Sequence, residues 1–196
     1  MTELLDREKY ISAGIHLGMR DKTKQMEPFI FKTRPDGLSI IDVEKIDERI
    51  GVAASFLSRF DKIMVAGRKE NAQEPIRKFG EAVEAKVIDG RFMPGTLTNP
   101  SLPNYDEPDV LLVADPLVDN QAIQEAVKKK IPIIAICDTF NDLDFIDLVL
   151  PGNNKGRKSV GTIFYLLARE ILKKKGEISS DEEFDYDLSD FTGEEE

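Results

Sequence analysis

Short apolar runs alternate with amphipathic stretches along the middle and end of the chain. The apolar runs have the length of buried strands and occupy residues 62–67, 86–89, 110–115, 133–138 and 148–150. The stretches between and after them repeat apolar residues at helical spacing and occupy residues 70–85, 120–130 and 158–175. Apolar strands that alternate with helices need helices on both faces of a parallel sheet. The pattern therefore predicts an α/β fold, a three-layer αβα sandwich with a mainly parallel sheet.

The N-terminal part of the chain follows a different pattern. Residues 4–15 mix apolar and charged positions at near-helical spacing, which predicts a helix. Two short β-prone runs, 29–31 and 38–41, flank the turn sequence Pro35-Asp36-Gly37 and predict a hairpin. Asp42 can cap the helix that is expected directly after it. A helix and hairpin region is therefore expected before the sandwich.

Charge is distributed unevenly between the body and the C-terminal end. The 196 residues include 27 basic and 37 acidic ones, which gives a formal net charge of −10. Ten of the acids and no basic residue lie in 177–196, so residues 1–176 carry 27 charges of each sign. Like charges at such density resist burial. We therefore predict one α/β domain over 1–176 and a disordered acidic tail over 177–196.

The acidic tail has two possible uses. It either solubilises the protein as a solvated segment, or it docks as an arm on a basic protein. Phe184, Tyr186 and Phe191 are spaced through the acids and would supply apolar anchors, which favours docking. An adaptor that works mainly through this arm, without RNA, is one hypothesis for the whole chain.

Composition excludes several classes of protein. Hydrophobic residues make up 41% of the chain and charged residues 33%, which fits a core with a highly charged surface. The single cysteine, Cys137, excludes an internal disulfide framework and points to a reducing compartment. No apolar run approaches the ~20 residues of a membrane span, and the charged start is unlike a signal peptide. These features predict a cytoplasmic protein.

The segment Gly152–Ser159 is the strongest candidate for an enzymatic nucleotide site. Its sequence, GNNKGRKS, resembles the phosphate-binding loop G-x-x-x-x-G-K-[ST] and lies between a predicted strand and helix. However, Arg157 occupies the position of the second glycine, where a long side chain obstructs the approach of backbone amides to phosphate. Only one helix and the tail follow this loop, whereas such enzymes build most of their sheet after it. A nucleotide hydrolase therefore remains only the alternative hypothesis.

Other catalytic or metal chemistry finds less support. His16 is the only histidine and lacks the companions of a zinc site. Cys137 ends a buried strand and is expected in the core. The carboxylates at 138 and 142–147 are explained by caps and turns. The sequence predicts no catalytic residue, no metal, no cofactor and no small-molecule substrate.

Basic residues instead gather in loops that are expected at one edge of the sheet. Loops after the carboxyl ends of parallel strands share an edge. The segment 151–159 offers two asparagines, two glycines and three cations at the start of a helix. Helix N-termini attract phosphate through unpaired amides, so an external polyanion is the expected counterpart. The alternative is an ordinary turn with solvated cations.

Two further groups of residues extend this prediction. The loop 91–100 carries hydroxyl and amide groups suited to phosphate or 2′-hydroxyl contacts, and cations also follow the first helix and the first strand. No paired aromatic residues form a base-stacking platform, so we expect contact with RNA backbone and shape. The predicted RNA-binding residues are Asn153, Asn154, Lys155, Arg157, Lys158, Arg91, Thr96, Thr98, Asn99, His16, Arg20, Lys22, Lys24, Lys32 and Arg34.

A series of short motifs between residues 5 and 176 resembles one known family. The motifs are His16-Leu17-Gly18, Gln25–Ile30, Asp36-Gly37, Pro94–Asn99, Asp115-Pro116, Asn120-Gln121-Ala122, Cys137-Asp138-Thr139, Pro151–Gly156, Ser159-Val160-Gly161 and Leu167–Glu170. In this order they resemble the universal family of small-subunit ribosomal protein two in its archaeal form, which is related to the eukaryotic laminin-receptor-like ribosomal protein.

The resemblance implies a flavodoxin-like sandwich without catalytic activity. It also implies a structural constituent of the small ribosomal subunit that is required for translation. The family's partners would be ribosomal RNA and neighbouring ribosomal proteins near the junction of head and body.

Overall fold

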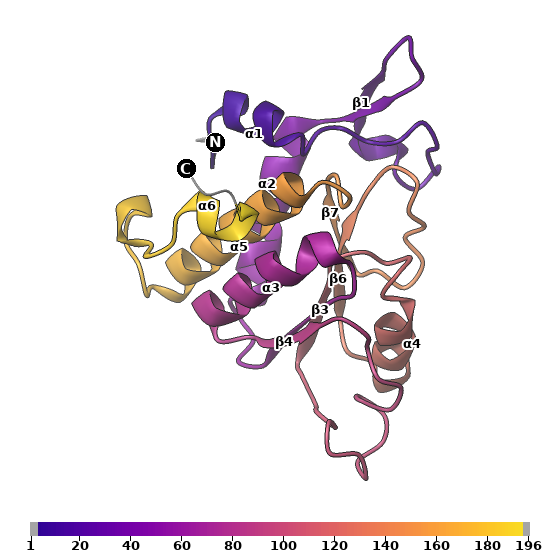
Figure 1. Cartoon of the computed structure of the whole chain (residues 1–196), viewed down its shortest axis with the longest axis vertical. Coiled ribbons are helices and arrows are strands. Elements are labelled where there is room, and N and C mark those ends of the chain that lie inside the picture. Colours follow the sequence, from indigo (N-terminus) through magenta and orange to yellow (C-terminus); the bar gives the residue numbers. More distant parts are fainter. Residues whose placement is uncertain (1–3, 194–196) are drawn as a thin grey trace.

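A computed structural model of the chain describes residues 4–193, and a five-stranded parallel sheet lies at its centre (Figure 1). The strands are β3 (Ile63–Gly67), β4 (Lys86–Asp89), β5 (Val110–Val113), β6 (Ile133–Cys137) and β7 (Leu148–Pro151). They lie side by side in the order β4-β3-β5-β6-β7, and each neighbouring pair is parallel. In chain order this is the 2-1-3-4-5 arrangement of flavodoxin-like sheets, which confirms the predicted fold class.

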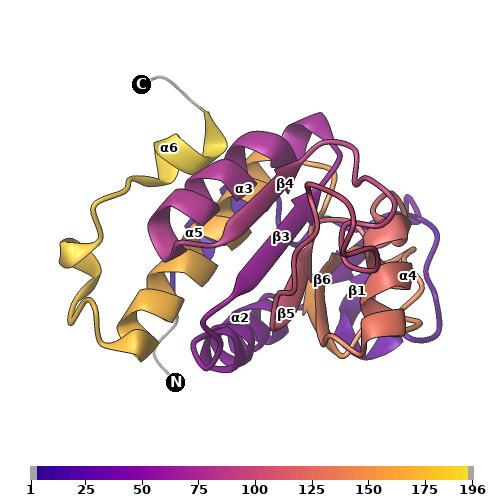
Figure 2. The same ribbon diagram turned by 90° about the horizontal axis from the view of Figure 1, so that it is seen from below.

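Helices cover both faces of this sheet. They are α2 (Val43–Leu57), α3 (Glu70–Val83), α4 (Asn120–Lys129) and α5 (Arg157–Lys175). Helices α2, α3 and α5 lie on one face and α4 on the other (Figure 2). Because α5 packs against both α2 and α3, most of its residues are buried. Strands β3, β5 and β6 are buried at every residue, as their apolar sequences predict.

The N-terminal elements pack beside the sandwich. They are α1 (Arg7–Ala13), the short 3₁₀ helix η1 (Glu27–Phe29), β1 (Ile30–Thr33) and β2 (Ser39–Ile41). Gly14 ends α1 in the left-handed conformation at φ 70°, which a glycine adopts readily. Strands β1 and β2 form the predicted antiparallel hairpin, which projects from the body (Figure 1). The carboxylate of Asp42 accepts the amide of Glu44 at 3.1 Å, so the predicted helix cap is confirmed.

The described part of the tail lies against the sandwich. It contains the 3₁₀ helix η2 (Asp181–Glu183) and α6 (Leu188–Thr192). Phe184 and Phe191 are buried, and their rings contact Tyr165 of α5 at centroid distances of 5.4 and 5.7 Å. Two of the aromatic residues that the sequence predicts as anchors for a partner, Phe184 and Phe191, therefore hold the tail against α5 of the same chain. Residues 194–196 lie outside the described residues, and the disorder expected of the free tail stays a prediction.

None of the helices within residues 4–193 has a stretch that is both long and apolar enough to cross a bilayer.

Candidate nucleic-acid interface

Buried polar side chains join the loops at the carboxyl edge of the sheet. The carboxylate of Asp115 accepts the amide of Leu117 at 3.0 Å and the side-chain amide of Asn141 at 3.3 Å, and it pairs with the Lys69 ammonium. The carboxylate of Asp119 accepts the backbone amides of Arg68 and Asp115 at 2.9 and 3.3 Å. The loops that follow β3, β5 and β6 are thereby connected to one another.

Burial changes the ionisation of two carboxyl groups in this network. Desolvation raises the pKa of Asp119 to about 6, although the amides of Arg68 and Asp115 favour its charged form. Desolvation also raises the pKa of Asp138, whose carboxylate accepts the amide of Thr139 at 2.6 Å. These carboxylates accept hydrogen bonds from the protein's own backbone amides, as carboxylates in helix caps and turns do. Among the described residues, no group of three or more His, Cys, Asp or Glu side chains could hold a metal ion.

The two asparagines of the loop before α5 hold that loop in shape. The side-chain oxygen of Asn153 accepts the amides of Lys155 and Gly156 at 2.9 and 3.2 Å, and its side-chain nitrogen donates to the Gly14 carbonyl at 3.2 Å. Asn154 is only 1% exposed and donates to Ile136 and Asn141 inside the protein. Both residues therefore position the loop, and the side chain of Asn154 is directed away from any surface ligand.

The three cations of this segment are exposed beside the N-terminus of α5. The Lys155 ammonium lies 4.1 Å from the centroid of the Phe140 ring, a cation–π contact. The Arg157 guanidinium pairs with the carboxylate of Glu74 on α3. Lys158 follows Arg157 in the first turn of α5. The segment thus presents positive charge to the outside where the first amides of α5 lack helical partners.

The loop after α1 is fastened to the same edge. The amide of Met19 donates to the Thr139 hydroxyl at 2.9 Å, the amide of Thr23 to the Thr139 carbonyl at 2.9 Å, and the amide of Asn153 to the Ile15 carbonyl at 2.9 Å. These bonds place the exposed cations of the loop beside the segment before α5. The cations concerned are Arg20, Lys22 and Lys24.

His16 and the hairpin cations have different surroundings. Burial lowers the pKa of His16, so its imidazole is neutral near pH 7, and its Nδ1 is buried without a hydrogen-bond partner among residues 4–193. Lys32 and Arg34 are exposed on the β1–β2 hairpin, and Arg34 pairs with Asp36 at 3.4 Å. The hairpin projects from the body (Figure 1), and its turn lies beside Arg20, whose Cγ is 3.7 Å from the point that a β-carbon would occupy at Gly37.

The loop after β4 uses most of its polar groups internally. The hydroxyl of Thr96 donates to Met93 at 2.7 Å, and the hydroxyl of Thr98 donates to Glu125 at 3.1 Å. Burial alone would raise the pKa of Glu125, but hydrogen bonds from the amides of Gly95 and Leu97 and from two side chains lower it. Thr96 and Thr98 therefore shape the loop. The side-chain oxygen of Asn99 likewise accepts the amide of Ser101 in a tight turn.

Arg91 is the exposed cation of that loop, and it lies near a residue that the sequence analysis missed. Arg68, Arg91 and Gln121 line a small cavity of about 170 Å³. Arg68 directly follows β3, so its position after an apolar strand was a signal in the sequence. It stands outside the cation clusters on which the prediction relied. We call Arg20, Lys22, Lys24, Arg68, Arg91, Lys155, Arg157 and Lys158 the basic edge.

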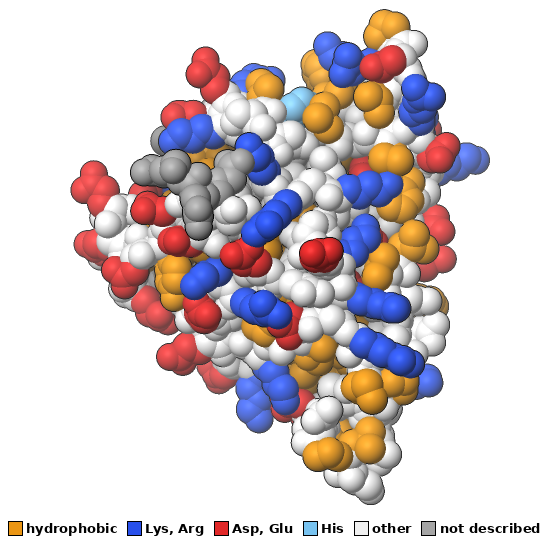
Figure 3. Space-filling view, in the orientation of Figure 1, with side chains coloured by type: hydrophobic (Ala, Val, Ile, Leu, Met, Phe, Trp, Pro, Cys, Tyr) orange, Lys and Arg blue, Asp and Glu red, His pale blue; other side chains and the backbone are white. Residues whose placement is uncertain are grey.

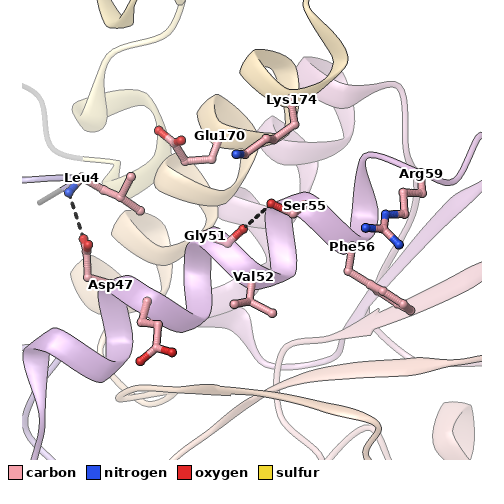
Figure 4. Close-up of a pocket in the computed structure, with 10 residues that line it drawn as sticks. Leu4, Asp47, Gly51, Val52, Ser55, Phe56, Arg59, Glu170 and Lys174 are labelled. Atoms are coloured by element: carbon pink, nitrogen blue, oxygen red, sulfur yellow. Dashed lines mark hydrogen bonds between the residues drawn. The ribbon is translucent and has the colours of Figure 1, made fainter. Parts of the chain in front are cut away.

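Acidic and basic side chains occupy different parts of the protein surface. On the face shown in Figure 3, Asp and Glu side chains gather at the left, over the tail, whereas Lys and Arg side chains run down the middle and right. A separate groove of about 590 Å³ lies between α2 and α5, and Val52, Phe56 and Glu170 are among the residues that line it (Figure 4). It contains none of the predicted RNA-binding residues.

The chain is similar to known proteins over nearly its whole length. Residues 10–102 and 103–174 match the family described as Ribosomal protein S2. The small ribosomal subunit protein uS2 of Picrophilus torridus is 49% identical over 190 residues, which cover 96% of this chain and 95% of that protein. The protein of the same name from Thermoplasma acidophilum is 50% identical, with 96% of both chains covered. The one from Staphylothermus marinus is 49% identical over 96% of this chain and 86% of its own length.

Proposed function

This chain belongs to the ribosomal protein S2 family in its archaeal form, and from that premise we propose that its basic edge binds ribosomal RNA. As a member of that family, it is a structural constituent of the small ribosomal subunit and takes part in translation as part of a ribonucleoprotein. Its relatives are structural ribosomal proteins. The prediction that it is not an enzyme is therefore confirmed, and the alternative hypothesis of a nucleotide hydrolase is rejected.

One observation carries the proposal about RNA. Cations from four separate segments converge on one edge of a domain whose charges balance overall. Hydrogen bonds between distant parts of the sequence hold two of these segments together, for example from the Asn153 side chain to the Gly14 carbonyl, 139 positions away. Cations so placed neutralise phosphates and release counterions, which is the main source of affinity for RNA backbone.

Two parts of the basic edge have distinct roles in this proposal. Arg157 and Lys158 lie beside the first amides of α5, where a helix N-terminus adds its own attraction for phosphate. Asn153, Asn154, Thr96 and Thr98 hold the loops that carry the cations, through the internal hydrogen bonds described above. Lys32 and Arg34, on the projecting hairpin, would reach a second stretch of RNA away from the sheet.

The acidic tail fits the proposal of a basic protein partner. Its aromatic side chains face α5, whereas the carboxylates of Glu182, Glu183, Asp185 and Asp187 are exposed. The docked tail therefore presents an acidic outer surface to a neighbour. We place the protein near the junction of head and body, next to other ribosomal proteins, as the family resemblance implies.

Co-sedimentation of the chain with small subunits that lack it tests the RNA proposal. The fraction bound should fall steeply as the salt concentration rises, because each released counterion adds to the salt dependence. Binding that does not change with salt would contradict a phosphate-dominated interface. It would leave the family assignment intact.

A further inference from the structure

Phe145 is both exposed and held in an unfavourable backbone conformation. Its side chain is 69% exposed, and its φ is 66°, in the left-handed region that bulky residues rarely adopt. The amide of Ile146 donates to the Leu143 carbonyl at 3.1 Å, which places Phe145 at the turn position that glycine prefers. Within residues 4–193, little burial of the ring offsets this strain. Such an outlier is a reason to look for a partner.

A hollow lies directly beside this ring. It has a volume of about 370 Å³ and is lined by Val127, Ile131, Pro132 and Lys130 together with Phe145. These residues come from the end of α4 and the turn that leads into β6. The hollow therefore lies at the amino edge of the sheet, at the opposite end of the strands from the basic edge.

Positive charge flanks the hollow. Lys128, Lys129 and Lys130 end α4, and all three are exposed. Lys129 pairs with Glu107 at 3.8 Å, but Lys128 and Lys130 form no ion pair within residues 4–193. The nearby carboxylates of Asp144 and Asp147 already accept hydrogen bonds, from the Gln25 side chain at 3.1 Å and from the amide of Ile133 at 2.8 Å. An acidic ligand is therefore complementary to this end of the molecule.

The chain itself shows which kind of segment covers such a surface. On α5, Tyr165 is flanked by Arg169 and Lys173, and the acidic, aromatic tail covers it. Asp181 pairs with both cations while Phe184 and Phe191 pack on the tyrosine ring. Phe145 with its two lysines repeats this combination of an aromatic ring and cations, but without a cover.

We propose that Phe145 and the adjoining hollow dock an acidic segment of a neighbouring protein of the small subunit. An apolar side chain of that segment fills the hollow, and its carboxylates lie over Lys128 and Lys130. The aliphatic and proline side chains of the lining favour an apolar side chain of a protein over RNA, because Lys130 is the one lining side chain that could donate to phosphate and the apolar groups offer no partners for base edges. The proposal rests on membership of the ribosomal family and is independent of where RNA binds.

Site-specific photo-crosslinking in assembled small subunits identifies the partner. The photoreactive residue benzoylphenylalanine replaces Phe145 in one variant and Leu117 in another. Leu117 is 67% exposed and follows β5 at the carboxyl edge, so it reports on the RNA proposal separately. From position 145 we expect a crosslink to a peptide of another ribosomal protein that is rich in Asp or Glu. A crosslink to ribosomal RNA, to a second copy of this chain or to nothing overturns the proposal, whatever position 117 shows.

A stability and affinity comparison separates docking from a structural role. The substitution Phe145→Gly relieves the strained φ and removes an exposed ring, so the isolated chain should unfold at the same or a higher temperature. Its affinity for small subunits that lack the protein should nevertheless fall about tenfold, as for a moderate interface hot spot. A lower unfolding temperature, or unchanged affinity, overturns the proposal.

Glu84→Gly is the matched control. Glu84 is also exposed and left-handed, at φ 57°, but it ends α3 away from the hollow. This variant should gain stability in the same way and bind subunits as the parent chain does.

Discussion

The backbone oxygen of Phe191 lies 2.6 Å from the point that a β-carbon would occupy at Gly161 in α5. A real β-carbon does not come so close to another atom, so the docked position of α6 requires a glycine there. Gly51 of α2 provides the contrast, since nothing lies within 4 Å of its corresponding point. The sequence of α5 is therefore matched to the tail that covers it.

Gly161→Ala should release the tail from α5 while the body stays folded. A methyl group at this position displaces the backbone of residues 191 and 192. Limited proteolysis should then cut within 177–193 several times faster than in the parent chain. Gly51→Ala is the control, which should stabilise the protein by about 1 kcal/mol through helix propensity and leave tail cleavage unchanged. Equal cleavage of the tail in both variants would show that α6 does not depend on this contact.

Removing two cations at the start of α5 should weaken RNA binding. The double substitution Arg157→Ala and Lys158→Ala eliminates two charges of the basic edge, so the slope of log affinity against log salt should flatten by about one to two units. Filter binding with a small-subunit RNA fragment across a salt series measures that slope. The pair Arg59→Ala and Lys62→Ala, exposed away from the basic edge, should leave it as it is. A slope that responds equally to both pairs would mean that the charge is not localised.

Glu74→Gln should act in the opposite direction. It removes the carboxylate that pairs with Arg157, so the guanidinium becomes available to phosphate and RNA affinity should rise a few-fold. Because both partners are about half exposed, the stability of the fold should change by less than about 1 kcal/mol. A gain from Glu74→Gln and a loss from Arg157→Ala, measured in the same assay, cannot both come from general destabilisation. Weaker binding by the Glu74 variant would remove Arg157 from the interface.

Asp119 should make the stability of the protein depend on pH in the mildly acidic range. Its pKa rises from 3.8 to about 6 on folding, so the folded state binds the proton more tightly than the unfolded state does. The free energy of unfolding should therefore increase by about 1.3 kcal/mol from this group as pH falls from 7 to 5, and by up to about 3 kcal/mol in total once pH is below 3.8. Denaturant titrations of the parent chain and Asp119→Asn isolate the effect, since only the parent has this group. Parallel pH profiles would contradict the assigned pKa.

The sequence predicted local structure well because local structure depends on neighbouring residues. Apolar runs such as 110–115 became buried strands, Asp42 became a cap, and the turn at Pro35-Asp36-Gly37 closed a hairpin. Each of these features depends on the order of a few adjacent side chains, and that order is visible in the sequence.

The candidate site was only partly predictable, because its contacts join distant segments. Asn153 reaches Gly14 across 139 positions, and Thr98 hydrogen-bonds to Glu125 in another element. Residue type showed that these groups could bind RNA, but not that the protein uses them internally. Arg68 was missed for a related reason, because it approaches Arg91 only after β3 and β4 pair in the sheet.

Directed hydroxyl-radical probing in assembled small subunits tests the central claim, that the basic edge faces ribosomal RNA. Cys137 is fully buried and burial raises its pKa, so a cysteine introduced at the surface can carry the iron chelate alone. Lys155→Cys places the probe on the basic edge, and Lys62→Cys places it at the opposite end of β3. We predict strong cleavage of ribosomal RNA from position 155 and little from position 62. Strong cleavage from position 62 with none from position 155 would contradict the account.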